Sequence, residues 1–283
     1  LTEKGKPLQE VTERIFQGLK TSADNVYILD LIERGRKNTK AYSKALEKEV
    51  ELESEIAKPL IKGGQMRRYL IEEPKKVVIF PYRMTELIPK KELQDRYPKC
   101  WGYLLANKKY LESRESGIMK GEHWYRYGRN QALNIINLPK IITPDLALAA
   151  SYCYDVEGIY LFTGGAAGGY GILPKEQINP KYLLGLLNSR LLDWFLHQSS
   201  TTFRGGYFSY ESRFIKQLPI RLIHFTNPAE KKLHDDLVAL VDVMLALHQR
   251  LPKAVGAERE QLQRQIEKTD GEIAGLVYRL YDI

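Results

Sequence analysis

The amino-acid sequence predicts a mixed α/β domain followed by an antiparallel hairpin of two helices. Up to about residue 225, short apolar runs of strand character alternate with stretches whose apolar residues recur at helical spacing. After Pro228, apolar residues recur every three or four positions through two stretches, which the helix breaker at residues 252–256 separates. We therefore expect residues 1–225 to form one domain and residues 226–283 to form the helical hairpin.

Local patterns predict the individual elements. Residues 76–82, KVVIFPY, form a continuous apolar run that predicts a strand buried on both faces. Val50 and Leu52 alternate with glutamates, which is typical of an edge strand. Further strands are expected at residues 26–29 and 140–143, with a β-hairpin at residues 151–155 and 159–162. Helices are expected at residues 55–60, 98–114 and 183–195, and a basic loop at residues 33–44.

The composition favours a polyanionic partner. The formal net charge is +8 and the isoelectric point is about 9.2, so nucleic acid is the first candidate and an acidic membrane surface the second. Tyrosine is frequent, with 18 residues against 8 phenylalanines, and it suits a wet binding surface, although half-buried sheet positions explain many of these residues. No apolar run is long enough for a membrane-spanning helix, and no signal peptide is visible.

The chemistry-bearing residues give no pattern of an active site. The two cysteines and five histidines lack metal-site spacing, so we expect no metal and a reducing, cytoplasmic setting. The glycine-rich residues 164–171, GGAAGGYG, lead into a strand rather than a helix, which favours a bend over a phosphate-binding loop. Residues 227–230, NPAE, differ from the Asn-Pro-Pro-aromatic motif that holds an amino group for methylation. We expect no catalytic residue here, and we expect a piece of a longer polypeptide because the chain begins with Leu1.

Three loops combine cations with aromatic or glycine residues, and they lie at residues 62–69, 124–131 and 199–207. Recognition of duplex DNA requires cations and amides that contact phosphates, together with a few side chains that read base edges. For any single residue, a solvated surface position or an internal ion pair is the safer interpretation, and it is the clustering in three loops that favours DNA contact for the set. The candidate DNA-binding residues are Lys62, Gln65, Arg67, Arg68, Trp124, Tyr125, Arg126, Arg129, Gln131, Thr202, Arg204 and Tyr207.

The order of segments resembles a known family. The segments are IFQGLKTSADNVYIL, KPLIKGGQMRRY, VVIFPY, WYRYGRNQAL, KIITPDLA, YLLGLLNSRLLDWFL and FIKQLPI. In this order, they are similar to the TaqI-like C-terminal specificity domain, the target-recognition domain of adenine-N6 DNA methyltransferases and of fused type IIG restriction–modification enzymes. The similarity extends from about Thr12 to Ile220. The glycine-rich residues 164–171 depart from the family pattern, and the base-contacting residues of the family differ from member to member.

The resemblance implies a DNA target-recognition domain without catalysis. It implies that the parent protein carries a separate catalytic domain, in cis or as a subunit, which binds S-adenosylmethionine and methylates a flipped adenine, with or without endonuclease activity. Three alternatives stay open. The chain could be the specificity subunit of a multi-subunit restriction enzyme or phage-defence methyltransferase, an enzyme with an unrecognised nuclease site, or a protein-interaction module.

Overall fold

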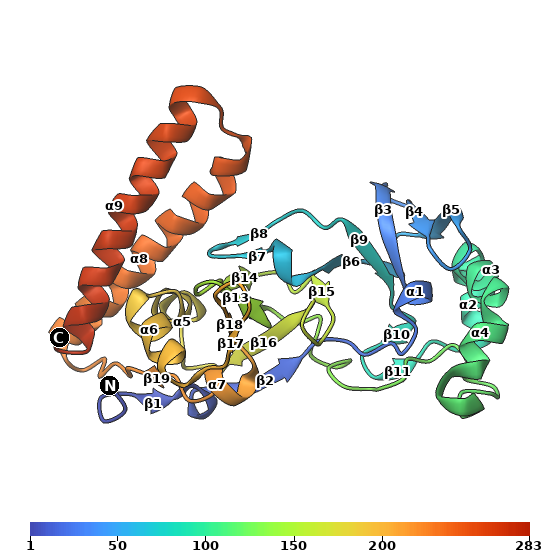
Figure 1. The fold of residues 1–283 in the computed structure, drawn as a ribbon, viewed down its shortest axis with the longest axis horizontal. Coiled ribbons are helices and arrows are strands. Elements are labelled where there is room, and N and C mark those ends of the chain that lie inside the picture. Colours follow the sequence, from blue (N-terminus) through green and yellow to red (C-terminus); the bar gives the residue numbers. More distant parts are fainter.

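Two hydrophobic cores divide the protein into two lobes (Figure 1). The computed structural model describes residues 1–283. The first lobe surrounds a cluster of 38 buried residues from Phe16 to Phe162, and the second lobe surrounds a cluster of 29 buried residues from Leu8 to Tyr281. Helices and strands are both abundant, which confirms the mixed α/β class.

A six-stranded sheet forms the first lobe, in the order β15-β6-β9-β3-β4-β5. All neighbouring strands are antiparallel except β15 and β6, which are parallel. The strands are β3 (Ile28–Arg34), β4 (Asn38–Ser43), β5 (Lys48–Glu53), β6 (Ala57–Ile61), β9 (Lys76–Ile79) and β15 (Leu161–Phe162). The edge position of β5 and the burial of β9 confirm two predictions.

Three local predictions in this lobe were wrong. Residues 38–43 form strand β4 instead of a loop, because the small side chains of Thr39, Ala41 and Ser43 alternate inward without a conspicuous apolar signal. Residues 57–61 form strand β6 instead of a helix, because pairing with β9 and β15 outweighs the helical pattern. The short helix α1 (Asp24–Tyr27) occupies the beginning of the strand expected at residues 26–29.

Helices cover the outer end of this sheet. Helices α2 (Lys90–Arg96), α3 (Pro98–Ala106) and α4 (Lys108–Ser113) precede the 3-10 turn η3 (Arg114–Gly117), which confirms the helical prediction for residues 98–114. Tyr103 on α3 fastens this layer, because its hydroxyl donates to the Val26 carbonyl at 2.8 Å and lies 2.9 Å from the Ser43 hydroxyl. A small hairpin of β10 (Tyr82–Arg83) and β11 (Glu86–Leu87) precedes the helices.

The second lobe contains an antiparallel sheet in the order β14-β12-β16-β2. Its strands are β2 (Thr12–Gln17), β12 (Lys140–Pro144), β14 (Cys153–Asp155) and β16 (Gly169–Pro174). The hairpin predicted at residues 151–162 was wrong, because β14 pairs with β12 whereas β15 pairs with β6 in the other lobe. Asp155 shapes this crossing: its carboxylate accepts the backbone N–H groups of Ile159 and Tyr160, and it pairs with the buried Lys140 ammonium at 2.6 Å.

Shorter strands surround this sheet. A three-stranded sheet has the order β13-β18-β17, and β7 and β8 form a hairpin that extends from the first lobe over the second lobe toward α8 (Figure 1). Strands β1 (Lys6–Pro7) and β19 (Pro219–Ile220) form a further antiparallel pair. The other short elements are β7 (Met66–Arg67), β8 (Leu70–Ile71), β13 (Leu146–Ala147), β17 (Thr202–Phe203) and β18 (Tyr207–Ser209), with the 3-10 turns η1 (Leu8–Glu10) and η2 (Gly63–Gln65).

The helix predicted at residues 183–195 is divided in two. Helix α5 (Pro180–Leu187) ends at Asn188, and α6 (Arg190–Ser199) begins after Ser189, whose hydroxyl accepts the Leu192 N–H. Asn188 exchanges two hydrogen bonds with the backbone of Tyr152, at 3.0 and 2.9 Å, so the break is anchored to the core. The short helix α7 (Ser212–Ile215) follows β18.

The C-terminal helical hairpin is confirmed. Helices α8 (Pro228–Arg250) and α9 (Gly256–Leu280), joined through the turn η4 (Leu251–Lys253), project from the second lobe (Figure 1). Apolar residues of both helices, including Leu237, Val241 and Leu276, belong to the same hydrophobic cluster as the leucines of α5. Gly185 permits this close approach, because a Cβ there would lie 2.9 Å from a methyl carbon of Val241. None of the helices is both long enough and apolar enough to cross a bilayer.

Candidate nucleic-acid interface

Four segments that are distant in the sequence line one cleft of about 640 Å³. They are residues 62–67, residues 144–151, residues 166–167 and residues 203–207. We call this the loop cleft. Two of the three predicted contact loops, at residues 62–69 and 199–207, therefore contribute to one concave surface. The third loop, at residues 124–131, does not line it.

Backbone hydrogen bonds hold these segments together. The Gly63 N–H donates to the Ala167 carbonyl at 3.0 Å, and the Asp145 N–H donates to the Gly168 carbonyl at 3.1 Å. The Tyr210 N–H, directly after β18, donates to the Asp145 carbonyl at 2.8 Å. The cleft is consequently built from backbone that is already paired, which favours a preformed surface.

The glycine-rich segment is a close-packed bend, as its sequence context predicted. A Cβ at Gly168 would lie 1.7 Å from the Thr163 carbonyl oxygen, and a Cβ at Gly169 would lie 2.2 Å from the Thr143 carbonyl oxygen. These glycines therefore allow backbone to approach backbone. Ala166 and Ala167 are the residues of this bend that line the loop cleft, so the bend contributes only two methyl groups to its surface.

A β-hairpin presents the most exposed part of the cleft. Strands β17 and β18 pair through Thr202 and Phe208 and through Phe203 and Tyr207, and the turn between them contains Gly205 and Gly206 at φ values of +86° and +79°. Thr202 and Arg204 are exposed, and Arg204 has no ion-pair partner. We call residues 202–207 the cleft hairpin.

The first basic loop divides its residues between surface and interior. Arg67 is exposed and pairs with Glu72 at 2.9 Å, while the half-buried Lys62 ammonium donates to the Thr163 hydroxyl at 2.9 Å, and burial lowers the pKa of Lys62. Gln65 is buried, where its side chain accepts the Lys62 N–H and donates to the Glu73 carbonyl. Gln65 therefore shapes the turn instead of facing a ligand.

Arg68 was expected to contact DNA, but the structure places it inside an ion pair. Its guanidinium donates to the carboxylate of Asp270 on α9 at 2.5 Å and to the Asn188 carbonyl at 2.8 Å. Asp270 also accepts from Arg190 at 3.3 Å. Arg68 thus fastens the helical hairpin to the second lobe.

The aromatic residues of the second predicted loop are core residues. Trp124 is 4% exposed and Tyr125 is 1% exposed, so the structure places both predicted contact residues inside the first lobe. The Trp124 ring packs against the Trp101 ring at a centroid distance of 5.6 Å, and the Tyr125 hydroxyl donates to the Ile88 carbonyl at 2.8 Å. Each ring therefore finds both an apolar neighbour and, for tyrosine, a polar partner inside the first lobe.

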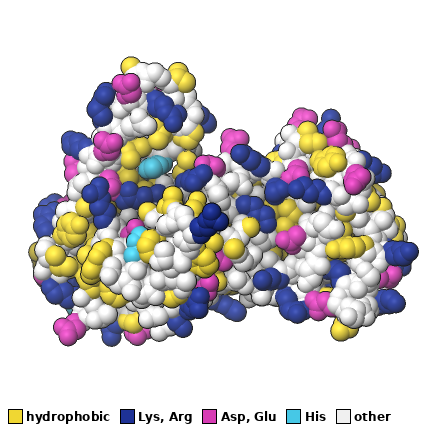
Figure 2. All heavy atoms as spheres, viewed as in Figure 1, with side chains coloured by type: hydrophobic (Ala, Val, Ile, Leu, Met, Phe, Trp, Pro, Cys, Tyr) yellow, Lys and Arg dark blue, Asp and Glu magenta, His cyan; other side chains and the backbone are white.

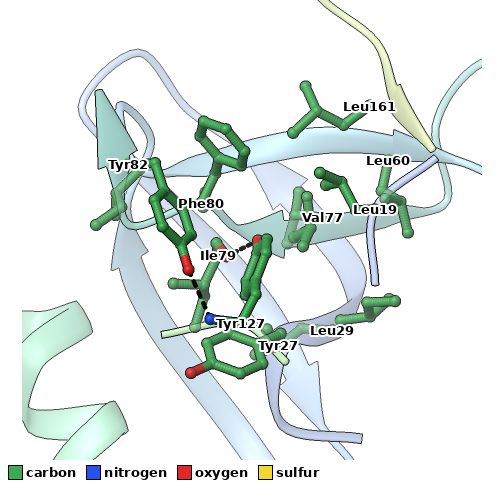
Figure 3. Packing of buried hydrophobic residues seen from close by; sticks show 14 of the residues in the cluster. Leu19, Tyr27, Leu29, Leu60, Val77, Ile79, Phe80, Tyr82, Tyr127 and Leu161 are labelled. Carbon is green, nitrogen blue, oxygen red and sulfur yellow. Dashed lines mark hydrogen bonds between the residues drawn. The ribbon is translucent and has the colours of Figure 1, made fainter. Parts of the chain in front are cut away.

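Tyr127, a third aromatic residue of this loop, is also buried in the core of the first lobe (Figure 3). Its hydroxyl donates to the Ile79 carbonyl, and its backbone N–H donates to the Tyr82 hydroxyl at 2.6 Å. Burial raises the pKa of Tyr82 to about 12. The three aromatic residues of this loop are thus part of the core of the first lobe.

The polar residues of this loop serve the first lobe as well. Arg129 pairs with Glu115 at 2.9 Å, and this hydrogen bond lowers the pKa of Glu115. Gln131 donates to the Gly18 carbonyl at 2.9 Å. Arg126 makes long hydrogen bonds to the carbonyls of Ile118 and His123, at 3.4 and 3.5 Å.

Residues 144–151 are a part of the cleft that sequence reasoning missed. Leu146, Leu148 and Ala149 line it, and Leu148 is 56% exposed. The sequence KIITPDLA, which contains the start of this segment, indicated only the resemblance to the family and no contact role. The available signal was the run of apolar residues that continues past Pro144, beyond the end of the strand. Nowhere in the chain do three or more His, Cys, Asp or Glu side chains gather in a way that could hold a metal ion.

The charge distribution agrees with a polyanionic ligand. Figure 2 shows Lys and Arg side chains along the middle of the molecule, where the two lobes meet. The loop cleft of this two-lobed α+β fold thus combines cations with exposed aromatic rings, two features that nucleic-acid-recognition domains share.

The comparison with known proteins specifies this class. The family profile described as the TaqI-like C-terminal specificity domain matches residues 58–220, which is more than half of the chain. The protein belongs to this family of specificity domains, as the order of its segments predicted.

Relatives of the chain are restriction–modification proteins. It is 26% identical to the type II restriction enzyme and methyltransferase RM.Eco57I of Escherichia coli, over 95% of this chain and 28% of that protein. It is 23% identical to the type II methyltransferase M.XhoI of Xanthomonas vasicola, over 84% of this chain and 40% of that protein. It is also 23% identical to the type II methyltransferase M.BstVI of Geobacillus stearothermophilus, over 80% and 36% respectively. The chain thus spans well under half the length of each of these relatives.

Proposed function

We propose that this protein recognises a specific sequence in duplex DNA through the loop cleft, as the specificity domain of a restriction–modification protein. The observation that carries the proposal is the convergence of Lys62, Arg67 and Arg204, from two separate loops, on one preformed cleft. Cations held on paired backbone can contact phosphates without a large ordering cost. Family membership supports the same ligand.

We assign different roles to the cleft residues. Arg204 has the exposed, unpaired guanidinium that bidentate contact with a guanine edge requires. Lys62 and Arg67, which line the cleft from the other loop, are suited to phosphate oxygens, as are the Tyr207 hydroxyl and the exposed hydroxyl of Thr202, next to the cleft-lining Phe203. The remaining predicted residues, Gln65, Arg68, Trp124, Tyr125, Arg126, Arg129 and Gln131, are proposed to maintain the fold.

We infer that methyl transfer takes place elsewhere in a longer parent protein. The parent is proposed to be an adenine-N6 methyltransferase, with or without endonuclease activity, whose catalytic domain acts in cis or as a subunit in the cytoplasm. The names of the relatives support a methyltransferase parent. We propose that S-adenosylmethionine binds in that catalytic domain, because two segments of this chain that resemble its binding motifs have other roles: the Asn227 side chain caps α8 by accepting the Ala229 N–H, and the glycines at 168–169 pack against backbone.

The two segments of the chain are proposed to divide the work. Residues 1–225 carry the recognition surface, and residues 226–283 brace the second lobe. The packing of α8 and α9 against α5, together with the Arg68–Asp270 ion pair, supports the bracing role. The hairpin therefore fixes the orientation of the β7–β8 loop that borders the cleft.

Selection from a random duplex pool tests the function. The purified chain is incubated with the pool at low salt, bound DNA is recovered and sequenced, and affinity for the enriched sequence is measured at increasing salt. We expect one enriched motif and an affinity that falls steeply with salt, because phosphate contacts release counterions. Binding without enrichment would contradict sequence specificity, and no binding at low salt would favour a protein-interaction module. Plasmid cleavage by the chain with Mg²⁺ would contradict the absence of catalysis.

A further inference from the structure

Apolar side chains stand exposed at the place where cations converge. Phe203 and Tyr207 on the cleft hairpin are each 42% exposed, and Leu148, on the neighbouring segment, is 56% exposed. All three line the loop cleft. The cleft therefore offers a hydrated apolar patch bordered by Lys62 and Arg204, which a purely phosphate-binding surface does not need.

The cleft hairpin is firmly supported at its base. The Ser200 hydroxyl donates to the Ser209 carbonyl at 2.6 Å, and the Ser209 N–H donates to the Thr201 carbonyl at 3.0 Å. Phe208, which points to the other side of β18 from Tyr207, stacks on the His197 ring of α6 with centroids 3.6 Å apart. The exposed rings consequently sit on a braced strand pair.

A second anchor holds the segment that carries Leu148. The Asp193 carboxylate on α6 accepts the Tyr210 hydroxyl at 2.5 Å and the Ala150 N–H at 2.9 Å. One carboxylate thus ties the cleft hairpin and residues 144–151 to the same helix. These partly buried hydrogen bonds hold the segment of Leu148 and the strand pair of the two rings in place relative to each other.

We propose that Phe203, Tyr207 and Leu148 form an apolar wedge that contacts nucleobases unstacked from the duplex. This deepens the function proposed above and rests on it. The charge around the patch selects the ligand, because a nucleobase reaches the cleft only with its phosphates, which Lys62 and Arg204 flank. Aromatic side chains stack on any base, and apolar side chains inserted at a base step stabilise a distorted duplex.

The wedge gives the chain a way to favour deformable DNA. In an intact duplex, the free energy of unstacking a base step opposes insertion. A duplex in which one step is already open avoids that penalty, so it binds more tightly if the wedge engages bases. A surface that contacts only phosphates and groove edges has no such preference.

The test compares two short duplexes of identical sequence, one fully paired and one with a single abasic site. Fluorescence anisotropy gives the dissociation constant of each for the wild-type chain and for Phe203→Ala. We expect the wild type to bind the abasic duplex about tenfold more tightly, a preference typical of one aromatic–base stack, and the variant to lose this preference. The variant should lose more affinity for the abasic duplex than for the paired duplex, so that the ratio of the two dissociation constants falls to about one; its cations, which contact both duplexes alike, are unchanged.

A matched control and a second variant keep the result interpretable. Phe225 is 53% exposed and lies outside the cleft, so Phe225→Ala should behave as wild type. Tyr207→Ala should reduce the preference independently of Phe203. A 2-aminopurine next to the abasic site should lose fluorescence with the wild type and not with Phe203→Ala, since stacking quenches it.

The outcomes separate this proposal from the proposed function. An equal preference for the abasic duplex in wild type and in both cleft variants would overturn the wedge and leave DNA binding intact. No preference in the wild type would also overturn it. Failure to bind either duplex would overturn both proposals.

Discussion

Residues 124–131 and residues 202–207 both combine arginine with aromatic side chains, but the structure buries the aromatic rings of the first and exposes those of the second. Trp124 and Tyr125 are at most 4% exposed, whereas Phe203 and Tyr207 are each 42% exposed. The first loop runs beneath a layer that already contains Trp101, Tyr82 and further rings. The second loop is a short strand pair with no layer above it. The composition of a loop therefore does not decide its role; what decides it is whether neighbouring elements supply apolar surface and carbonyl acceptors.

Two adjacent arginines also differ in their surroundings. Arg67 and Arg68 are identical in type, yet Arg67 is exposed beside the cleft and Arg68 reaches Asp270 on α9. Arg67 is the last residue of β7, whereas Arg68 begins the turn between β7 and β8, so one cation stays beside the cleft and the other reaches the helical hairpin.

Replacing Tyr127 tests the burial of the first loop. Tyr127→Ala should lower the free energy of unfolding by about 3–5 kcal/mol, because it removes a large buried ring and its hydrogen bonds. Tyr207→Ala, which removes an exposed ring, should change it by no more than about 0.5 kcal/mol. Urea unfolding followed by circular dichroism measures both. Similar losses for the two variants would contradict the assignment of the first loop to the core.

Replacing the two neighbouring arginines tests their different roles. Arg68→Ala should destabilise the protein by about 2 kcal/mol, because the mostly buried Asp270 carboxylate loses its shorter ion pair and keeps only the longer one to the exposed Arg190. Arg67→Ala should be nearly neutral for stability and should weaken DNA binding. Thermal unfolding and anisotropy titration of the same two variants give the comparison. A stable Arg68→Ala variant with impaired DNA binding would restore Arg68 to the interface.

Replacing cleft and non-cleft arginines tests the ligand assignment. Arg204→Ala should weaken binding to the selected DNA sequence by about 1–3 kcal/mol if it reads a base edge. Arg126→Ala should change the dissociation constant by less than about threefold, since its position lies outside the cleft. Anisotropy titrations at two salt concentrations measure the affinity and its salt dependence. The reverse order of effects would move the interface to the first lobe.

The joint between the helical hairpin and the second lobe should be sensitive to pH. His248 on α8 lies beside the Tyr69 ring, with centroids 5.7 Å apart, and burial and the nearby Arg68 lower its pKa from 6.5 to about 4, with Asp270 opposing. Between these two pH values, the unfolded chain binds a proton that the folded chain does not, so stability falls as the pH decreases from about 6.5 to 4. Because the ring is partly exposed and solvent screens its charge, we expect the free energy of unfolding to fall by only about 1 kcal/mol. Urea unfolding at pH 7 and pH 5 should show a smaller difference in His248→Gln than in wild type, and an equal difference would contradict this role.

Several features were predictable from the sequence because they depend on local or strongly periodic patterns. The helical hairpin follows from the heptad spacing, and β9 follows from its continuous apolar run. The bend at residues 164–171 follows from its glycines and from the strand after it. The framework of the family was recognisable because seven segments keep their order.

Other features depend on long-range packing that local patterns do not encode. Strand β6 forms because β9 and β15 lie on either side of it, against its own helical pattern. The crossing from β14 to β15 depends on the Asp155 carboxylate, which accepts the backbone N–H groups of Ile159 and Tyr160. In the predicted hairpin, strand pairing would have used these N–H groups instead. The contribution of residues 144–151 to the cleft depends on Asp193, about 40 residues further along the chain, which holds the Ala150 N–H.

Hydrogen–deuterium exchange of the chain, with and without the selected duplex, gives the most direct test of the loop cleft as the DNA interface. Bound DNA should slow exchange at residues 62–67, 144–151 and 202–209, and should leave residues 124–131 unchanged. Slower exchange at residues 124–131 without change in the cleft hairpin would contradict the assignment of the loop cleft as the DNA-binding surface.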